Sequence, residues 1–184
     1  CDIWDVTDKF KPIQAAQFRK QRLRPGDFII ECCCAATIYG ECLLVYEVNN
    51  TSGGVCRDRS RNYAELYKRP STAGENVEEI DRLGWYTDQW NKPTGLEELY
   101  RLLKGWPDLQ DFCGINSAAT MEELTIYQEV IEKDERGNTK RFLGARRGGH
   151  DDCVSPLFML AYIIRYQYDL ISESEIDPKL QKCN

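Results

Sequence analysis

Alternating hydrophobic and polar positions predict two β-hairpins in this chain. Residues 3–18 alternate around a polar turn at residues 7–9. Residues 126–143 contain two strand-like runs on either side of a turn at residues 135–138. Short runs of this kind around a polar turn are typical of antiparallel strand pairs.

Apolar residues at helical spacing predict three helices. The first begins near Asp27, which we interpret as its N-cap, and ends at Gly40. The second opens at residues 92–94 and carries four leucines on one face. The third carries its apolar residues from Val154 onward, and Pro156 lies in its first turn, where the missing N–H costs little.

Residues 42–46 form an apolar run without polar alternation, which is typical of a strand buried on both faces. Together with the hairpins and helices, this run predicts an α/β fold on one core. A length of 184 residues is within the usual range for one domain. We therefore expect a single domain over residues 1–184, with a polar tail at about residues 172–184.

Charge and cysteine content narrow the classes of function. The 30 acidic and 24 basic residues give a net charge of −6. This charge argues against a protein that coats nucleic acid nonspecifically. It does not argue against an enzyme that reaches DNA through metal ions and local basic patches. Nine cysteines without a C-x-x-C pattern, and a single histidine, argue against a disulfide framework and a zinc site. The longest apolar run, at residues 156–164, is too short for a membrane span. We expect a reduced, cytoplasmic protein without a membrane segment.

Acidic residues follow or precede two of the predicted elements. Glu47 follows the apolar run, at the end of a strand where α/β proteins build their sites, although a simple loop residue would also fit. Asp151 and Asp152 precede the last helix, where one Asp could act as an N-cap. Two adjacent acids repel each other unless a cation sits between them, and carboxylates are the ligands that Mg²⁺ and Mn²⁺ prefer. The pattern therefore suggests a divalent metal site, with helix capping as the alternative.

Four segments, in this order and spacing, resemble the nuclease domain of phage terminase large subunits. They are residues 45–53 (VYEVNNTSG), residues 84–87 (GWYT) followed by Lys-Pro, residues 121–124 (MEEL) and residues 149–152 (GHDD). The Gly-His-Asp-Asp string before an apolar helix is the most specific of them, and residues 47–50 are the second. The likeness spans nearly the whole chain.

The resemblance implies a ribonuclease H-like fold, with a mixed central sheet flanked by helices and a β-hairpin near the active site. It implies an endonuclease that cuts concatemeric double-stranded viral DNA by two-metal hydrolysis with Mg²⁺ or Mn²⁺. By residue-to-residue matching, Glu47, Asp151 and Asp152 would be its catalytic metal ligands. The implied partners are double-stranded DNA and, in the full packaging system, the terminase ATPase domain, the small terminase subunit and the portal, in the cytoplasm of a bacterial host.

One departure from the family pattern leaves a second function open. In the family, the first catalytic Asp lies on a strand that precedes the hairpin at residues 3–18. We interpret Asp2 and Asp5 as residues of the family's second strand, which is the first strand of this hairpin, and not as that acid. The chain also contains no G-x-x-x-x-G-K-[ST] phosphate-binding motif, so the packaging ATPase is not expected in it. The alternative is a noncatalytic DNA-binding or motor-docking module derived from the same fold.

Basic residues form three clusters, at residues 19–24, at residues 57–61 and in a set that we call the basic hairpin cluster. Solvated surface charge is the ordinary explanation for such clusters. The basic hairpin cluster differs because it leads directly into Asp151, and cations beside a metal site can hold the phosphates that flank the cut. Its members are Lys140, Arg141, Arg146 and Arg147.

Two other residue types could contact DNA. Trp85, Trp90 and Trp106 could stack on bases, but packing in the core or anchoring of loops is the favoured interpretation. His150 could contact a phosphate or a water molecule, or it could make a structural hydrogen bond in its loop.

Overall fold

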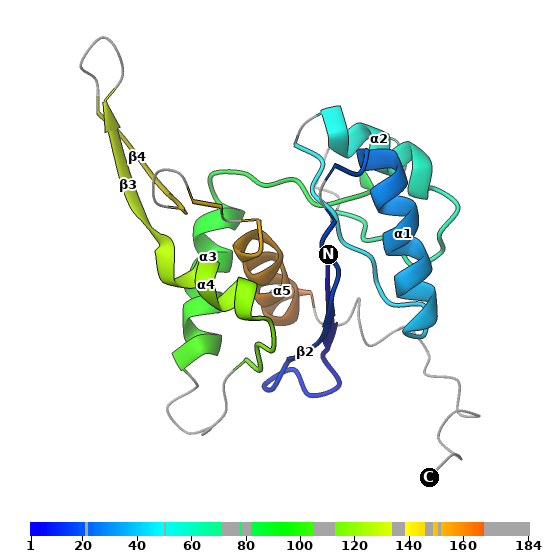
Figure 1. Cartoon of the computed structure of the whole chain (residues 1–184), viewed down its shortest axis with the longest axis horizontal. Helices are drawn as coiled ribbons and strands as arrows, with labels where there is room; N and C mark the ends of the chain where they lie inside the picture. The colour runs from blue at the N-terminus through cyan, green and yellow to red at the C-terminus, as the bar shows by residue number, and fades with distance from the viewer. Residues whose placement is uncertain are drawn as a thin grey trace. The chain divides into compact units, whose positions relative to one another are not determined.

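The computed structural model describes residues 1–20, 22–49, 51–70, 78, 82–104, 113–133, 139–145, 149–150 and 152–167, with the backbone alone at residues 132, 133 and 140–142. Within these ranges the protein is mixed α/β, with five helices and two small antiparallel sheets (Figure 1). The helices are α1 (Pro25–Ile38), α2 (Thr51–Ser60), α3 (Asn91–Lys104), α4 (Ala118–Ile126) and α5 (Val154–Tyr166). The strands are β1 (Asp2–Asp5), β2 (Ile13–Gln17), β3 (Tyr127–Lys133) and β4 (Thr139–Ala145).

Some sequence predictions fall outside the described residues: those on Arg146, Arg147, Asp151, Trp106 and the tail at 172–184. No described helix has the length and apolar character that crossing a membrane would require.

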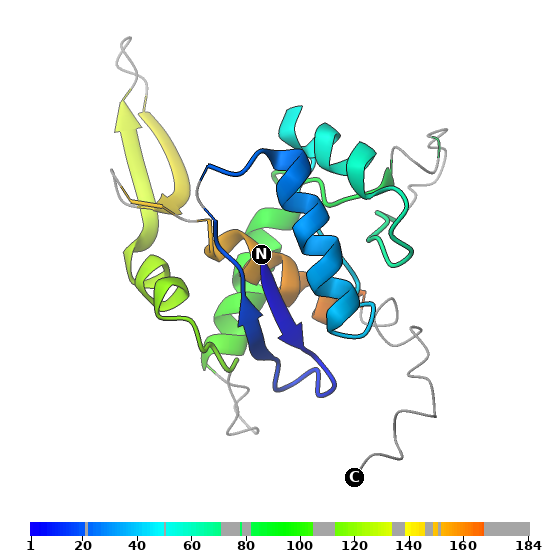
Figure 2. The same ribbon diagram turned by 45° about the vertical axis from the view of Figure 1, so that its right-hand side comes forward.

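The chain divides into two compact units. The first contains the described parts of residues 1–18 and 93–169, and the second contains those of residues 19–92. Both hairpins therefore belong to the first unit, together with α4, α5 and most of α3. Helices α1 and α2 belong to the second unit, where they pack side by side (Figures 1 and 2).

Both predicted hairpins are confirmed. Strands β1 and β2 pair antiparallel, with a register shift between Ile3 and Trp4. Strands β3 and β4 pair antiparallel without a shift, from Tyr127 opposite Ala145 to the far ends of both strands. Figures 1 and 2 show this second pair as a narrow ribbon that continues directly from α4. Ile126, predicted as the first strand residue, is instead the last residue of α4.

The three predicted helices are confirmed as α1, α3 and α5, but the predicted N-cap of α1 is wrong. The N-cap residue is Arg24, and Pro25 follows it in the first turn. Proline fixes the helical φ and has no N–H to lose, so the helix begins two residues before Asp27. Asp27 lies inside the first turn, where its carboxylate still favours the positive end of the helix dipole.

The core of the first unit lies between α3 and α5. Leu99 on α3 is buried, and so are Leu157 and Phe158 on α5. Burial of each such side chain contributes about 1.5–3 kcal/mol to stability. Gly95 permits the close approach of the two helices, because a Cβ at this position would lie 2.7 Å from the backbone oxygen of Phe158.

Candidate active site

An extended segment at residues 42–48 carries the first predicted acid. Leu44 exchanges two backbone hydrogen bonds with residues 65–67, at 2.8 and 3.0 Å, and Trp85 bonds twice to the end of the segment, at 2.7 and 2.8 Å. All four bonds involve even-numbered residues of the segment and therefore lie along one edge of it. Among residues 42–46 only Leu44 is buried. The prediction of a strand buried on both faces is wrong, because residues 42, 43, 45 and 46 are only half-buried.

The backbone around Glu47 is fixed by contacts on two sides. The Asn49 side chain donates to the Thr87 carbonyl oxygen (2.5 Å) and accepts from the Thr87 N–H (2.7 Å), so that it continues the pairing one step further. Gly53 in the first turn of α2 packs against the same backbone, since a Cβ there would lie 2.7 Å from the oxygen of Glu47. The position of Glu47 is therefore set by the fold rather than by its own side chain.

The Glu47 side chain itself is exposed. Its carboxylate makes no hydrogen bond or ion pair with any residue that the structure describes. Both carboxylate oxygens can thus coordinate a cation without breaking a hydrogen bond or ion pair to the described residues.

The start of α5 tests whether Asp152 caps this helix. The N-cap residue is Cys153, which has helical dihedral angles and makes no side-chain capping bond. Its backbone N–H instead donates to Oε2 of Glu123, a buried residue of α4, at 2.6 Å. The hydrogen bond at this helix start is therefore supplied by Glu123 and not by Asp152.

Asp152 is exposed, and in the described part of the chain its carboxylate has no hydrogen-bond or ion-pair partner. His150, two residues earlier, is also exposed and makes no loop hydrogen bond with a described residue. Helix capping was the alternative interpretation of the Asp pair, and for Asp152 the geometry removes it.

The predicted acids are distributed over both units. Glu47 lies in the second unit and Asp152 in the first. Among the described residues, no group of three or more His, Cys, Asp or Glu side chains is placed to hold a metal ion. The exposed carboxylates of Glu47 and Asp152 nevertheless provide oxygen ligands, which are the kind that hard divalent cations prefer.

The two acids near the N-terminus have structural partners. The Asp2 carboxylate accepts hydrogen bonds from the amides of Gln14 (2.6 Å) and Gln17 (2.8 Å). Asp5 accepts from the hydroxyl and the N–H of Thr7, and these bonds lower the pKa of Asp5. Both acids lie in β1, the first strand of this hairpin, which the resemblance matches to the family's second strand, and both carboxylates are hydrogen-bonded within the hairpin.

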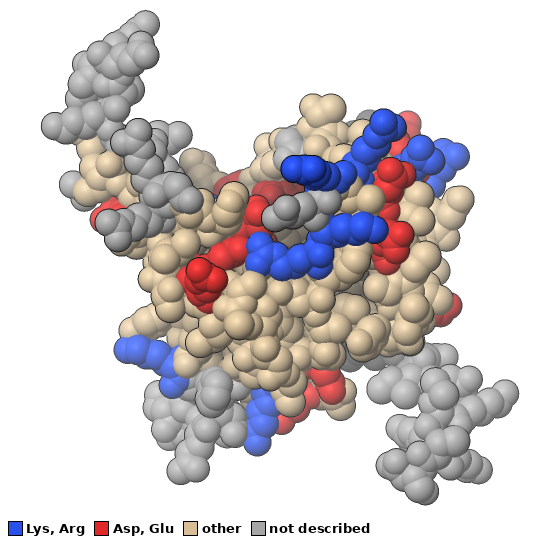
Figure 3. Space-filling view, in the orientation of Figure 1, with Lys and Arg blue, Asp and Glu red and all other residues tan. Residues whose placement is uncertain are grey.

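Basic residues of two of the predicted clusters lie on α2 and on β4. Arg57 and Arg59 lie in the last turn of α2 around Asp58, and on the face that Figure 3 shows, blue and red side chains mix over α1 and α2. A surface of mixed sign attracts phosphates weakly. In the basic hairpin cluster, Lys140 and Arg141 lie on β4, paired with Glu132 and Ile131 of β3.

The tryptophans also differ from one another. Trp85 is 2% exposed and packs against Tyr67 with a ring-centroid distance of 5.8 Å, so the core interpretation is confirmed for it. Trp90 is 74% exposed, although its backbone N–H donates to Asp88 Oδ1 at 2.7 Å.

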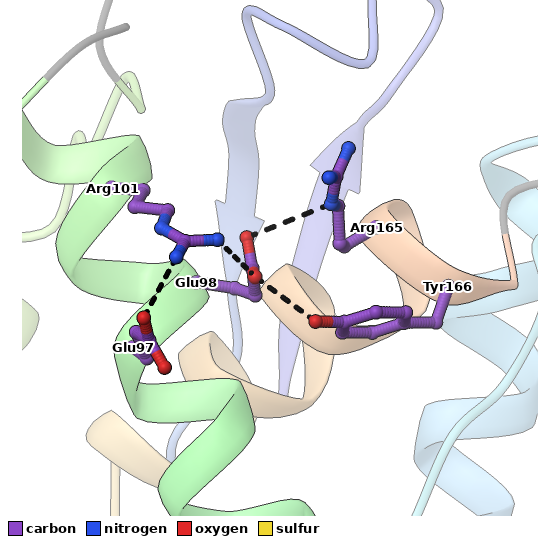
Figure 4. A network of polar contacts seen from close by, with 5 residues as sticks. All are labelled: Glu97, Glu98, Arg101, Arg165 and Tyr166. Carbon is purple, nitrogen blue, oxygen red and sulfur yellow. Dashed lines mark hydrogen bonds and ion pairs between the residues drawn. The ribbon is translucent and has the colours of Figure 1, made fainter.

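The carboxylate of Glu98 on α3 lies in a network that joins α3 to α5 (Figure 4). Its Oε1 accepts from Arg101 (2.7 Å) and from the Tyr166 hydroxyl (3.1 Å), and Arg165 lies 4.0 Å from its Oε2. Desolvation, together with the bond to Glu98, raises the pKa of Tyr166 and keeps the hydroxyl protonated as a donor. Two guanidinium groups neutralise this buried carboxylate, so it acts as a clamp between helices rather than as a ligand for a cation.

A cavity of about 100 Å³ lies beside this network, with an apolar floor of Leu102, Ala161 and Ile164. It lies at the C-terminal end of α5, whereas Asp152 precedes the N-terminal end. The 13 residues of α5 separate the two places by roughly 20 Å along the helix axis. The cavity is therefore separate from the Asp152 turn.

The eight described cysteines are free thiols. Burial raises the pKa of Cys32 to about 11 and that of Cys113 to about 12. Protonated, buried thiols of this kind behave as small hydrophobic residues.

No protein-family model, no curated protein and no solved structure matches this chain. The resemblance to terminase nucleases therefore stands on the sequence segments alone, and the function that it implies is a proposal.

Sequence reasoning missed the roles of two residues at this site. Asn49 and Glu123 both lie in segments that resemble the family, but nothing in the sequence indicated that Asn49 clamps Thr87 or that Glu123 reaches α5.

Proposed function

We propose that this chain is the nuclease domain of a viral DNA-packaging terminase, a metal-dependent endonuclease that cuts concatemeric double-stranded DNA. The observation that carries the proposal is the helix start at α5. Glu123 accepts a hydrogen bond from the Cys153 N–H, and the exposed carboxylate of Asp152 next to it makes no hydrogen bond or ion pair with a described residue. This carboxylate can therefore bind a cation without losing a hydrogen bond or ion pair to the described residues.

The order of elements supports a ribonuclease H-like arrangement. An antiparallel hairpin and a helix precede the extended segment that ends at Glu47, and a second extended segment at Trp85 pairs with it in parallel. The β3–β4 ribbon then precedes α5 directly in the chain. This is the order that the resemblance implies, with the hairpin immediately ahead of the Asp pair.

Glu47, Asp151 and Asp152 would hold Mg²⁺ or Mn²⁺. When bound, such ions generate a nucleophile from water and stabilise the charge that develops on the phosphate. The chain's own part is to present these carboxylates: Glu47 from a backbone fixed by Asn49 and Gly53, and Asp152 from a turn held by Glu123. The basic hairpin cluster would hold phosphates that flank the cut, without reading base sequence.

Titration of Mn²⁺ into the purified chain by calorimetry tests this function. We expect binding by the wild type, a loss of binding in Glu47→Gln and in Asp152→Asn, and unchanged binding in Glu122→Gln. Glu122 is a suitable control because it is an exposed acid on α4. Equal Mn²⁺ affinity in all four proteins would contradict the proposal. DNA binding without any uptake of Mn²⁺ would favour the noncatalytic docking module instead.

A further inference from the structure

Glu123 is a buried carboxylate that is not one of the proposed metal ligands. It lies on α4 and is 6% exposed, and Cys153, whose N–H donates to it, is 4% exposed. The N···O distance of 2.6 Å is short, as expected for a hydrogen bond to a charged acceptor. In a site shielded from water, such a bond holds its two partners firmly in one geometry.

A second contact holds the same cysteine from another element. The Gln17 amide nitrogen on β2 lies 3.6 Å from the Cys153 sulfur and 2.9 Å from the hydroxyl of Thr120 on α4. The Gln17 oxygen accepts from the hydroxyl of Ser117, the N-cap residue of α4, at 2.6 Å. Helix α4, which carries Glu123, is thus tied to β2 and to the start of α5 by one polar network.

The effect of this network falls on the residue that precedes Cys153. Asp152 lies in the turn before α5, and its neighbour is fixed through both its backbone and its side chain. Asp152 itself remains exposed and without a described partner. The fold therefore fixes the backbone at this acid and leaves the acid's oxygens available.

We propose that Glu123 is a positioning residue that holds the Asp152–Cys153 turn so that the Asp152 carboxylate can bind a hard divalent cation. This inference rests on the proposed function and assigns the residue that orients one of its ligands. Mutation of groups that bond directly to metal ligands typically costs about 10–100-fold in metal affinity. Glu123 acts through the backbone of the next residue, so we expect an effect at the lower end of this range.

Two conservative variants separate positioning from the alternatives. Glu123→Gln keeps an acceptor oxygen at the same reach and loses the charge. Glu123→Asp keeps the charge but withdraws the carboxylate by one methylene, about 1.5 Å, which takes the bond to Cys153 beyond hydrogen-bonding distance. The readouts are the Mn²⁺ dissociation constant of the full chain by calorimetry, exchange of the Cys153 amide hydrogen, and melting without metal.

We expect Glu123→Gln to bind Mn²⁺ within about threefold of the wild type, and Glu123→Asp to bind it at least about tenfold more weakly, with faster exchange of the Cys153 amide. Glu122→Gln is the matched control and should leave all three readouts unchanged. Wild-type affinity in Glu123→Asp would overturn the positioning role. So would an equal loss in both variants, or a loss in Glu123→Gln alone, since either would report packing or charge instead. If the wild type itself takes up no Mn²⁺, the proposed function fails, and the inference fails with it.

Discussion

Asp152→Asn distinguishes a metal ligand from a structural acid without any activity assay. In the structure the hydrogen bond at the start of α5 goes to Glu123, so the substitution removes no hydrogen bond from the described part of the protein. What it does remove is one exposed negative charge near the positive end of a helix. We therefore expect the metal-free protein to lose little stability.

The size of the effect follows from that geometry. A surface carboxylate at a helix N-terminus contributes about 0.3–1 kcal/mol, and relief of repulsion with the adjacent Asp151 offsets part of it. The expected change in the free energy of unfolding is below about 1 kcal/mol, or about 2–4 °C in melting temperature for a chain of this size. Breaking the Glu123–Cys153 bond with Glu123→Ala should instead cost about 1.5–3 kcal/mol, because that bond is buried and charge-assisted.

Addition of Mn²⁺ should make the effect of Asp152→Asn on the melting temperature larger than it is in the metal-free protein. At one hundred times its dissociation constant, a ligand of the folded state adds about 2.7 kcal/mol, which should raise the wild-type melting temperature by about 5–10 °C. Asp152→Asn should lose most of this increase. The assay is thermal melting of both proteins with and without Mn²⁺. A metal-free loss above about 2 kcal/mol in Asp152→Asn would refute the reasoning, and so would a full Mn²⁺ shift in the mutant.

Three further outcomes are expected. Changing the basic hairpin cluster to alanine should weaken binding to all DNA sequences alike and flatten the log–log salt dependence by about 0.9 per lost phosphate contact, whereas an unchanged slope would indicate plain surface charge. Gly53→Ala should lower both the melting temperature and Mn²⁺ affinity, because its Cβ would push against the backbone of Glu47; unchanged Mn²⁺ affinity would show that this packing does not position the acid. In thiol labelling at pH 8, Cys32 and Cys113 should react only on unfolding, since burial raises both pKa values and keeps the thiols protonated; the exposed Cys34 should react first, a phase that Cys34→Ser removes.

The elements that could be predicted from the sequence are those that bury apolar side chains. Helices α1, α3 and α5 and both hairpins show the expected spacing. Helices α2 and α4 do not, because their buried residues are small or polar: Gly53 and Ser60 in α2, and Thr120 and Glu123 in α4. Such helices are stabilised by close packing and by polar contacts to distant residues, and neither leaves an apolar stripe in the sequence.

The candidate site was predictable to a similar extent. Glu47 and Asp152 were identified as acids next to predicted elements, and both carboxylates are exposed. The residues that hold them in place were not identified, since the bonds from Asn49 to Thr87 and from Cys153 to Glu123 join positions 30 or more residues apart. Long-range pairing of this kind depends on the tertiary fold and cannot be read from local spacing.

The central claim is that these acids support cutting of DNA by bound metal ions. Its most direct test is the cutting of supercoiled plasmid by the purified protein. We predict nicking and linearisation with Mn²⁺ or Mg²⁺, loss of both in Glu47→Gln and Asp152→Asn, and loss of both in excess EDTA. Cutting that continues at the wild-type rate in excess EDTA, or in either variant, would contradict the account.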